Sequence, residues 1–240
     1  RYAKDGDTVK LLANAELDET YVNEKSLTLD LNGKTITGTP AEAKAYAVIT
    51  NKGTLTIQGE GAVICNHTLA GSTSYAVNTI TNCGTLVIDG ATIENKSTAN
   101  NQIGYAIDNN STVADAVVTI VSGTVTVSGS NYYDGIRQFC NSTTFENNVI
   151  VKGGEVSSIW MQNPSDGAEK NTKDVNGSVT IEGGEVTALY LEPSANFEAA
   201  ITAGYVGEVS YFQKADGRDL VKFITGGTFG SDVTELCALG

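Results

Sequence analysis

Five side chains in the middle of the chain combine hydrogen-bonding, charged and aromatic groups at a recurring spacing. They are Asn78, Asp108, Arg137, Trp160 and Tyr190, and they lie 30, 29, 23 and 30 residues apart. Aromatic faces stack on the apolar faces of sugar rings, while neighbouring polar groups bond to sugar hydroxyls. If these five side chains form one line, here called the candidate row, they have the chemistry of a glycan-binding strip.

A packing role for the two aromatic residues is the alternative interpretation. Trp160 and Tyr190 could lie beneath the segment 163–177, NPSDGAEKNTKDVNG, which is polar and has no apolar period. Exposed aromatic side chains need a reason, and a covering loop supplies one. The sequence leaves both interpretations open.

Acidic residues near the candidate row raise the question of catalysis. Glycoside hydrolysis requires two carboxyl groups that face each other at about 5 to 9.5 Å. Asp108 and Asp134 are the acids that we place near the middle of the row, but no sequence pattern around them meets the geometric roles of an active site. We therefore expect no catalytic residue, and a polysaccharide lyase or glycoside hydrolase stays as the alternative function.

Metal-binding patterns are weak in this chain. The cysteines and the single histidine have no zinc-site spacing: Cys65, Cys83, Cys140, Cys237 and His67. Three Gly-Glu-Val segments place Glu155, Glu185 and Glu208 where stacked strands would bring them about 4.8 Å apart. Calcium prefers six or more oxygen ligands, so we interpret this glutamate series as solvated and expect no metal and no cofactor.

The strands that would carry these residues repeat along the chain. The alternating run Leu27 to Gly38, LTLDLNGKTITG, contains an Asn32-Gly33 turn, and related runs follow it. Their second apolar residues are Leu29, Ile57, Ile88, Ile120, Val151, Ile181 and Ile224, separated by 28, 31, 32, 31, 30 and 43 residues. A period near thirty with sheet-like alternation is typical of a parallel β-solenoid.

A second motif has the same period and positions the candidate row. Tyr-Ala-Val or Tyr-Ala-Ile begins at Tyr46, Tyr75 and Tyr105. We expect an inward-pointing series at Val48, Val77, Ile107, Ile136, Ile159 and Leu189. Because side chains alternate along a strand, the next residues should point outward: Ile49, Asn78, Asp108, Arg137, Trp160 and Tyr190.

These patterns predict an all-β, right-handed, single-stranded parallel β-helix of seven to eight coils. Residues 1–26 differ from the repeat, and we expect them to form an N-terminal cap because a stack of strands otherwise exposes its last apolar cross-section. Residues 27–240 are then one continuous domain of coils.

Composition and charge exclude several partners. The chain has 240 residues, with 15 basic and 28 acidic side chains and a net charge of −13. Nucleic-acid phosphates and anionic membrane surfaces would be repelled. The sequence contains no apolar run of membrane-spanning length and no signal-peptide pattern. We expect neither nucleic-acid binding nor membrane insertion.

Four segments carry a resemblance to a known group of proteins. They are GDTVKLL (6–12), LTLDLNGKTITG (27–38), NKGTLTIQG (51–59) and ITGGTFGSDV (224–233). Together they resemble the right-handed, pectate-lyase-like parallel β-helix modules of large exported surface proteins of anaerobic gut bacteria. The resemblance implies export and a place in a longer, adhesin-like polypeptide, so signal and anchor would lie outside this segment.

From this resemblance we expect a non-catalytic structural or adhesive module, located outside the cell or on its surface. Its expected ligand is a glycan or another surface ligand, contacted through the candidate row. Similar repeats occur in phage fibres, and a fibre segment is the third alternative.

Overall fold

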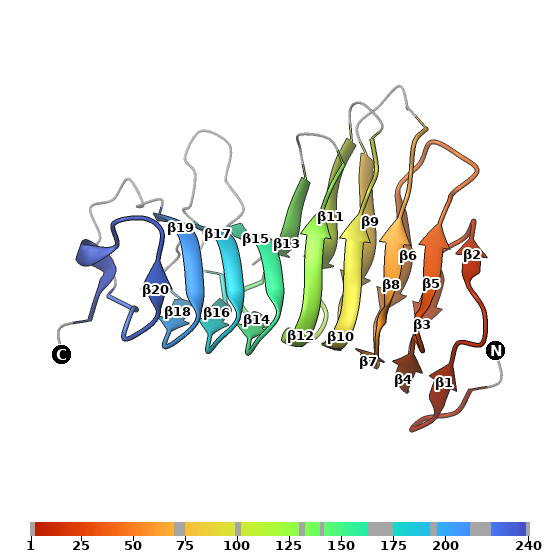
Figure 1. The fold of residues 1–240 in the computed structure, drawn as a ribbon, viewed down its shortest axis with the longest axis horizontal. Helices are drawn as coiled ribbons and strands as arrows, with labels where there is room; N and C mark the ends of the chain where they lie inside the picture. Colours follow the sequence, from red (N-terminus) through yellow and green to blue (C-terminus); the bar gives the residue numbers. More distant parts are fainter. Residues whose placement is uncertain are drawn as a thin grey trace.

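The computed structural model describes residues 3–69, 75–98, 102–129, 133–139, 142–162, 175–192, 196–211 and 222–238. In these ranges the strands stack as three parallel ladders, and the two chain ends lie at opposite ends of the stack (Figure 1). The predicted all-β parallel β-helix is confirmed. The described ranges contain one helical turn, η1 (Thr234–Leu236), and no helix long and apolar enough to cross a bilayer.

The first ladder joins the strands of the sequence repeat. Its strands are β1 (Thr8–Lys10), β4 (Ser26–Asp30), β7 (Thr54–Gln58), β10 (Thr85–Asn95), β12 (Ala116–Val127), β14 (Asn147–Val151), β16 (Gly177–Ile181) and β18 (Phe197–Ile201). The repeat residues pair in register: Leu29, Ile57, Ile88, Ile120, Val151 and Ile181. From Ile57 to Ile181 these side chains are fully buried, because apolar residues at alternate positions face the interior.

The number of full-length coils is about five. Between Leu29 and Ile181 the chain makes five turns, of 28, 31, 32, 31 and 30 residues. The outer coils are shorter, since Val9 pairs with Leu29 and Ile181 pairs with Ile201 after only 20 residues each. The prediction of seven to eight coils was therefore too high, because it counted the shortened coils after Ile181 as repeats.

The second and third ladders complete each coil. The second contains β2 (Ala15–Leu17), β5 (Lys34–Gly38), β8 (Gly61–Cys65), the second halves of β10 and β12, the first halves of β15 (Glu155–Gln162), β17 (Glu185–Leu191) and β19 (Tyr205–Tyr211), and β20 (Thr228–Phe229). The third contains β3 (Tyr21–Asn23), β6 (Tyr46–Asn51), β9 (Tyr75–Asn82), β11 (Gln102–Asn109), β13 (Tyr133–Phe139) and the second halves of β15, β17 and β19.

Tight corners separate the ladders. Asn32 and Gly33 have φ of 51° and 71°, so both adopt the left-handed conformation that this dipeptide tolerates well. Gly184 has φ of 75°, and a Cβ there would lie 2.7 Å from the carbonyl carbon of Gly153 in the preceding coil. Glycine at 184 thus permits both the backbone conformation and the close stacking of successive corners.

A row of buried asparagines runs through the third ladder. Asn23, Asn51, Asn82 and Asn109 pair in register, and the side-chain amide of each of the first three donates to the Oδ1 of the next one at 2.8 Å. Each amide also donates to a main-chain carbonyl oxygen. The row places polar groups inside the solenoid without leaving them unsatisfied. The row was not predicted, although its spacing of 28, 31 and 27 residues is visible in the sequence.

The N-terminal end of the stack is hollow and apolar. A cavity of about 360 Å³ is lined by residues that include Val9, Leu17, Leu29 and Ile36. The strands β1 to β3 contribute a short coil of their own, paired with β4 to β6. The boundary at residue 26 between cap and coils stays a prediction.

Candidate functional site

Four residues of the candidate row lie in one line on the outside of the third ladder. Asp108 pairs with Arg137, Arg137 with Trp160, and Trp160 with Tyr190, so the four occupy the same position on successive strands. The residue before each of them is fully buried: Ile107, Ile136, Ile159 and Leu189. Asp108, Arg137, Trp160 and Tyr190 are called the outer row below.

The first members of the expected series do not belong to this line. Thr81, not Asn78, pairs with Asp108, while Asn78 pairs with Tyr105. Ile49, which was expected to point outward, is 2 % exposed and is part of the core. The Tyr-Ala-Val motif gave the wrong register here because it stands at a different distance from the asparagine row in each strand.

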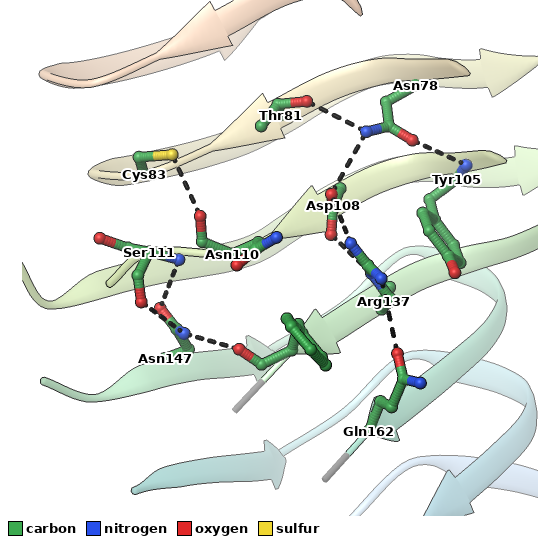
Figure 2. A network of polar contacts seen from close by, with 11 residues as sticks. Asn78, Thr81, Cys83, Tyr105, Asp108, Asn110, Ser111, Arg137, Asn147 and Gln162 are labelled. Atoms are coloured by element: carbon green, nitrogen blue, oxygen red, sulfur yellow. Dashed lines mark hydrogen bonds and ion pairs between the residues drawn. The ribbon is translucent and has the colours of Figure 1, made fainter. Parts of the chain in front are cut away.

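Asp108 and Arg137 form a two-point ion pair at one end of the outer row. The Arg137 Nε donates to Asp108 Oδ1 at 2.8 Å, and its Nη2 donates to Asp108 Oδ2 at 2.9 Å (Figure 2). The side chains are 5 % and 17 % exposed for Asp108 and Arg137 respectively. Fork-to-fork pairing of this kind fixes the guanidinium in position as well as neutralising it.

Other groups occupy the rest of the Arg137 guanidinium. Its Nη1 donates to Gln162 Oε1 at 3.5 Å, and its central carbon lies 4.6 Å from the ring centre of Tyr105 and 4.8 Å from that of Phe139. Burial by itself lowers the pKa of Arg137, but Asp108 and Tyr105 outweigh it, so the net pKa is raised. Arg137 is therefore a permanently charged group whose three nitrogens each donate a hydrogen bond within the protein.

Asn78 still contacts the outer row from its own register. Its Nδ2 donates to Asp108 Oδ2 at 3.3 Å and to Thr81 Oγ1 at 3.1 Å, and its Oδ1 accepts the main-chain N–H of Tyr105 at 3.2 Å. Figure 2 shows the resulting polar chain from Asn78 through Asp108 and Arg137 to Gln162, across β9, β11, β13 and β15. Asn78 thus supports Asp108 and belongs to the framework of the site.

Trp160 and Tyr190 form the partly exposed end of the outer row. They pair in register on β15 and β17, and buried residues flank each of them on its own strand. The Trp160 indole Nε1 donates to Glu192 Oε1 at 3.2 Å, which holds the ring by its polar edge. Burial raises the pKa of the Tyr190 phenol, and the carboxylates of Glu208 and Asp134 raise it further. The two aromatic side chains are anchored next to acidic groups.

No family profile, curated protein or solved structure matches the chain.

Asp134 and Ser158 adjoin the outer row and were not part of the candidate row. Ser158 Oγ donates to Asp134 Oδ1 at 3.1 Å and accepts the main-chain N–H of Gly135 at 2.9 Å. Burial raises the pKa of the Asp134 carboxyl, although the Ser158 hydrogen bond opposes this. The sequence placed Asp134 near the row, but Ser158 could be found only from the pairing of β13 with β15.

The glutamate series on the second ladder is only partly stacked. Glu155 pairs with Glu185, as expected, but the third position is taken by Tyr205, while Glu208 pairs with Ala188 on the third ladder. The described residues contain no group of three or more histidine, cysteine or acidic side chains arranged to hold a metal ion. The predicted three-glutamate stack was therefore wrong at its last member.

The outer row combines two different chemical ends. At one end, Asp108 and Arg137 neutralise each other and are largely buried, with Tyr105 and Phe139 close to the guanidinium. At the other, Trp160 and Tyr190 present aromatic surface at adjacent positions on a flat sheet, about 4.8 Å apart along the solenoid axis. Both aromatic side chains are half-buried, and residues 163–174, which the alternative interpretation placed over them, lie outside the described residues.

Proposed function

We propose that this chain is a non-catalytic β-helical module of an exported bacterial surface protein, and that it contacts glycans through Trp160 and Tyr190. The solenoid gives an elongated framework, and its third ladder carries the outer row. The proposal places the module outside the cell or on its surface, as the resemblance to exported β-helix modules implies.

The in-register pairing of Trp160 with Tyr190 carries the proposal. Sugar rings present apolar faces that stack on aromatic side chains, and their hydroxyls bond to neighbouring polar groups. Glu192 accepts the Trp160 indole N–H and so fixes the ring before any ligand arrives. A platform that is already ordered loses less conformational entropy on binding.

A glycan array tests the proposal directly. The intact protein should bind at least one glycan class, and Trp160→Ala should lose that binding. Val121→Ala is the matched control, because Val121 is an exposed apolar residue on β12, outside the third ladder. Absence of any bound glycan, or equal binding by the parent and Trp160→Ala, would remove the glycan-binding role.

One observation favours the alternative of a polysaccharide-cleaving enzyme. A general acid needs a raised pKa, and burial raises the pKa of Asp134 beside the outer row. Its test is an assay for new reducing ends and unsaturated products on a polysaccharide panel, with and without calcium. Activity that Asp134→Asn abolishes would establish the enzyme; product formation unaffected by this substitution would exclude Asp134 as its acid.

A further inference from the structure

We infer that the glycan bound by Trp160 and Tyr190 carries no carboxylate or sulfate groups. This inference rests on the proposed function and narrows its ligand class to uncharged sugar polymers. It depends on the pairing of Arg137 with Asp108 and on the charged side chains near the two aromatic rings.

The charge of Arg137 is already compensated by a carboxylate of the protein. Two of its nitrogens bond to the Asp108 carboxylate and a third bonds to Gln162. The guanidinium carbon also lies close to two aromatic rings, those of Tyr105 and Phe139. A sugar carboxylate would have to displace Asp108, which is 5 % exposed and would then be a buried unpaired charge. The residue that would be the natural anion-binding group is thus already neutralised.

Among the described residues, three acidic side chains lie near Trp160 and Tyr190. Glu192 accepts the Trp160 indole N–H at 3.2 Å, so a carboxylate lies at the edge of that ring. Asp134 and Glu208 act electrostatically on Tyr190 from the neighbouring coils. The whole chain has a net charge of −13. An anionic polymer would therefore meet repulsion both on approach and in contact.

The test compares each polymer with its own charged derivative. Starch, β-1,4-glucan and mannan are measured beside the same polymers after oxidation of their primary hydroxyls to carboxylates, with polygalacturonate as a natural anionic polymer. We expect an uncharged polymer to bind in a Trp160-dependent way and its oxidised form to bind roughly tenfold or more weakly, with a smaller difference at high salt because salt screens exposed charges.

Two variants test whether the negative charge beside Trp160 causes the weaker binding of oxidised polymers. Glu192→Gln keeps an oxygen that can accept the Trp160 indole N–H but removes the negative charge. It should therefore reduce the difference in affinity between the neutral and the oxidised polymer. Glu155→Gln makes the same change in charge on the second ladder and should leave that difference as it is in the parent.

The outcomes distinguish this inference from the proposed function. Trp160-dependent binding of polygalacturonate or of an oxidised polymer, at least as tight as that of the neutral form, overturns the inference while the proposed function stands. Binding to none of the polymers, or binding that Trp160→Ala does not change, overturns the inference together with the proposed function. A preference for the neutral polymer that Glu192→Gln reduces and Glu155→Gln leaves unchanged supports both the inference and the proposed function.

Discussion

The carboxylate of Asp108 accepts two hydrogen bonds from the guanidinium of Arg137, at 2.8 and 2.9 Å, on the outside of the solenoid. An ion pair on a sheet surface would ordinarily be exposed, and it would then contribute little to stability. This one is largely buried, with Tyr105 and Phe139 against the guanidinium. The pair joins two successive coils where the outer row begins, and Arg137 lies beside Trp160 on the next strand.

Removal of one member of the Asp108–Arg137 ion pair should destabilise the fold. Asp108→Ala leaves Arg137 charged and mostly buried, and we expect a loss of about 3 to 5 kcal/mol in the free energy of unfolding. Urea denaturation measures it. Replacing both residues by apolar ones, Asp108→Leu with Arg137→Met, should recover most of the loss.

An exposed ion pair supplies the control for this experiment. Lys44 and Glu42 also lie 2.8 Å apart, but their side chains are 62 % and 71 % exposed. Glu42→Ala should therefore cause no measurable loss. Equal effects of Asp108→Ala and Glu42→Ala would contradict the claim that the Asp108–Arg137 pair is shielded from solvent.

The asparagine row predicts a second stability effect. Asn82→Ala removes the acceptor of the Asn51 amide and the donor to Asn109 Oδ1, and both partners are buried. We expect a loss of at least about 2 kcal/mol in unfolding free energy, because buried polar groups would be left unpaired. Asn66→Ala is the control, since Asn66 is exposed. A parent-like urea midpoint for Asn82→Ala would show that the row does not stabilise the coils.

Adjacent positions on β10 test the inward and outward faces. Ile88 is fully buried and pairs with Ile57 and Ile120, so Ile88→Asp should cost more than about 4 kcal/mol and can prevent folding. Val87 is the preceding residue and is only half-buried, so Val87→Asp should cost about 1 kcal/mol or less. Thermal melting followed by circular dichroism compares the stability of the two variants. If Val87→Asp were the less stable variant, the assignment of Ile88 to the core face would be wrong.

His67 predicts a dependence of stability on pH. Burial lowers the pKa of His67, and its Nδ1 accepts the main-chain N–H of Leu69 at 3.3 Å, so the folded state favours the neutral ring. The unfolded chain, with an ordinary pKa of about 6.5, binds the proton more readily. The stabilising contribution is thus present above about pH 6.5 and is lost as the pH falls below it.

Urea denaturation at pH 7.5 and pH 5.5 measures this effect. The parent should lose more unfolding free energy between these pH values than His67→Gln does. Only the change with pH is compared, because the substitution itself alters the packing. If parent and variant lose the same amount, protonation of His67 does not contribute.

The repeat predicted the first ladder well, because each coil must place apolar residues such as Ile57, Ile88 and Ile120 at the same position to form one continuous core. The part of the outer row from Asp108 to Tyr190 could be predicted for the same reason. The terminal coils could not, since the strand motif persists there although the connecting segments shorten.

Register on the third ladder was harder to predict. Tyr75 stands seven residues before Asn82, but Tyr105 stands only four before Asn109, and the asparagines set the register because their side chains bond to one another. Aligning the tyrosines therefore shifted Asn78 by three positions. The partner of Trp160, Glu192, and the contact of Ser158 with Asp134 depend on three-dimensional pairing and left no sequence motif.

The single tryptophan permits the most direct test of the glycan-binding role. Trp160 is the only tryptophan in the chain, so its fluorescence reports on the outer row alone. Titration with a glycan that the array identifies should shift Trp160 emission and protect it from quenching by acrylamide, with the same midpoint as binding measured by calorimetry. Calorimetric binding that leaves both the emission and the quenching of Trp160 unchanged would contradict the account.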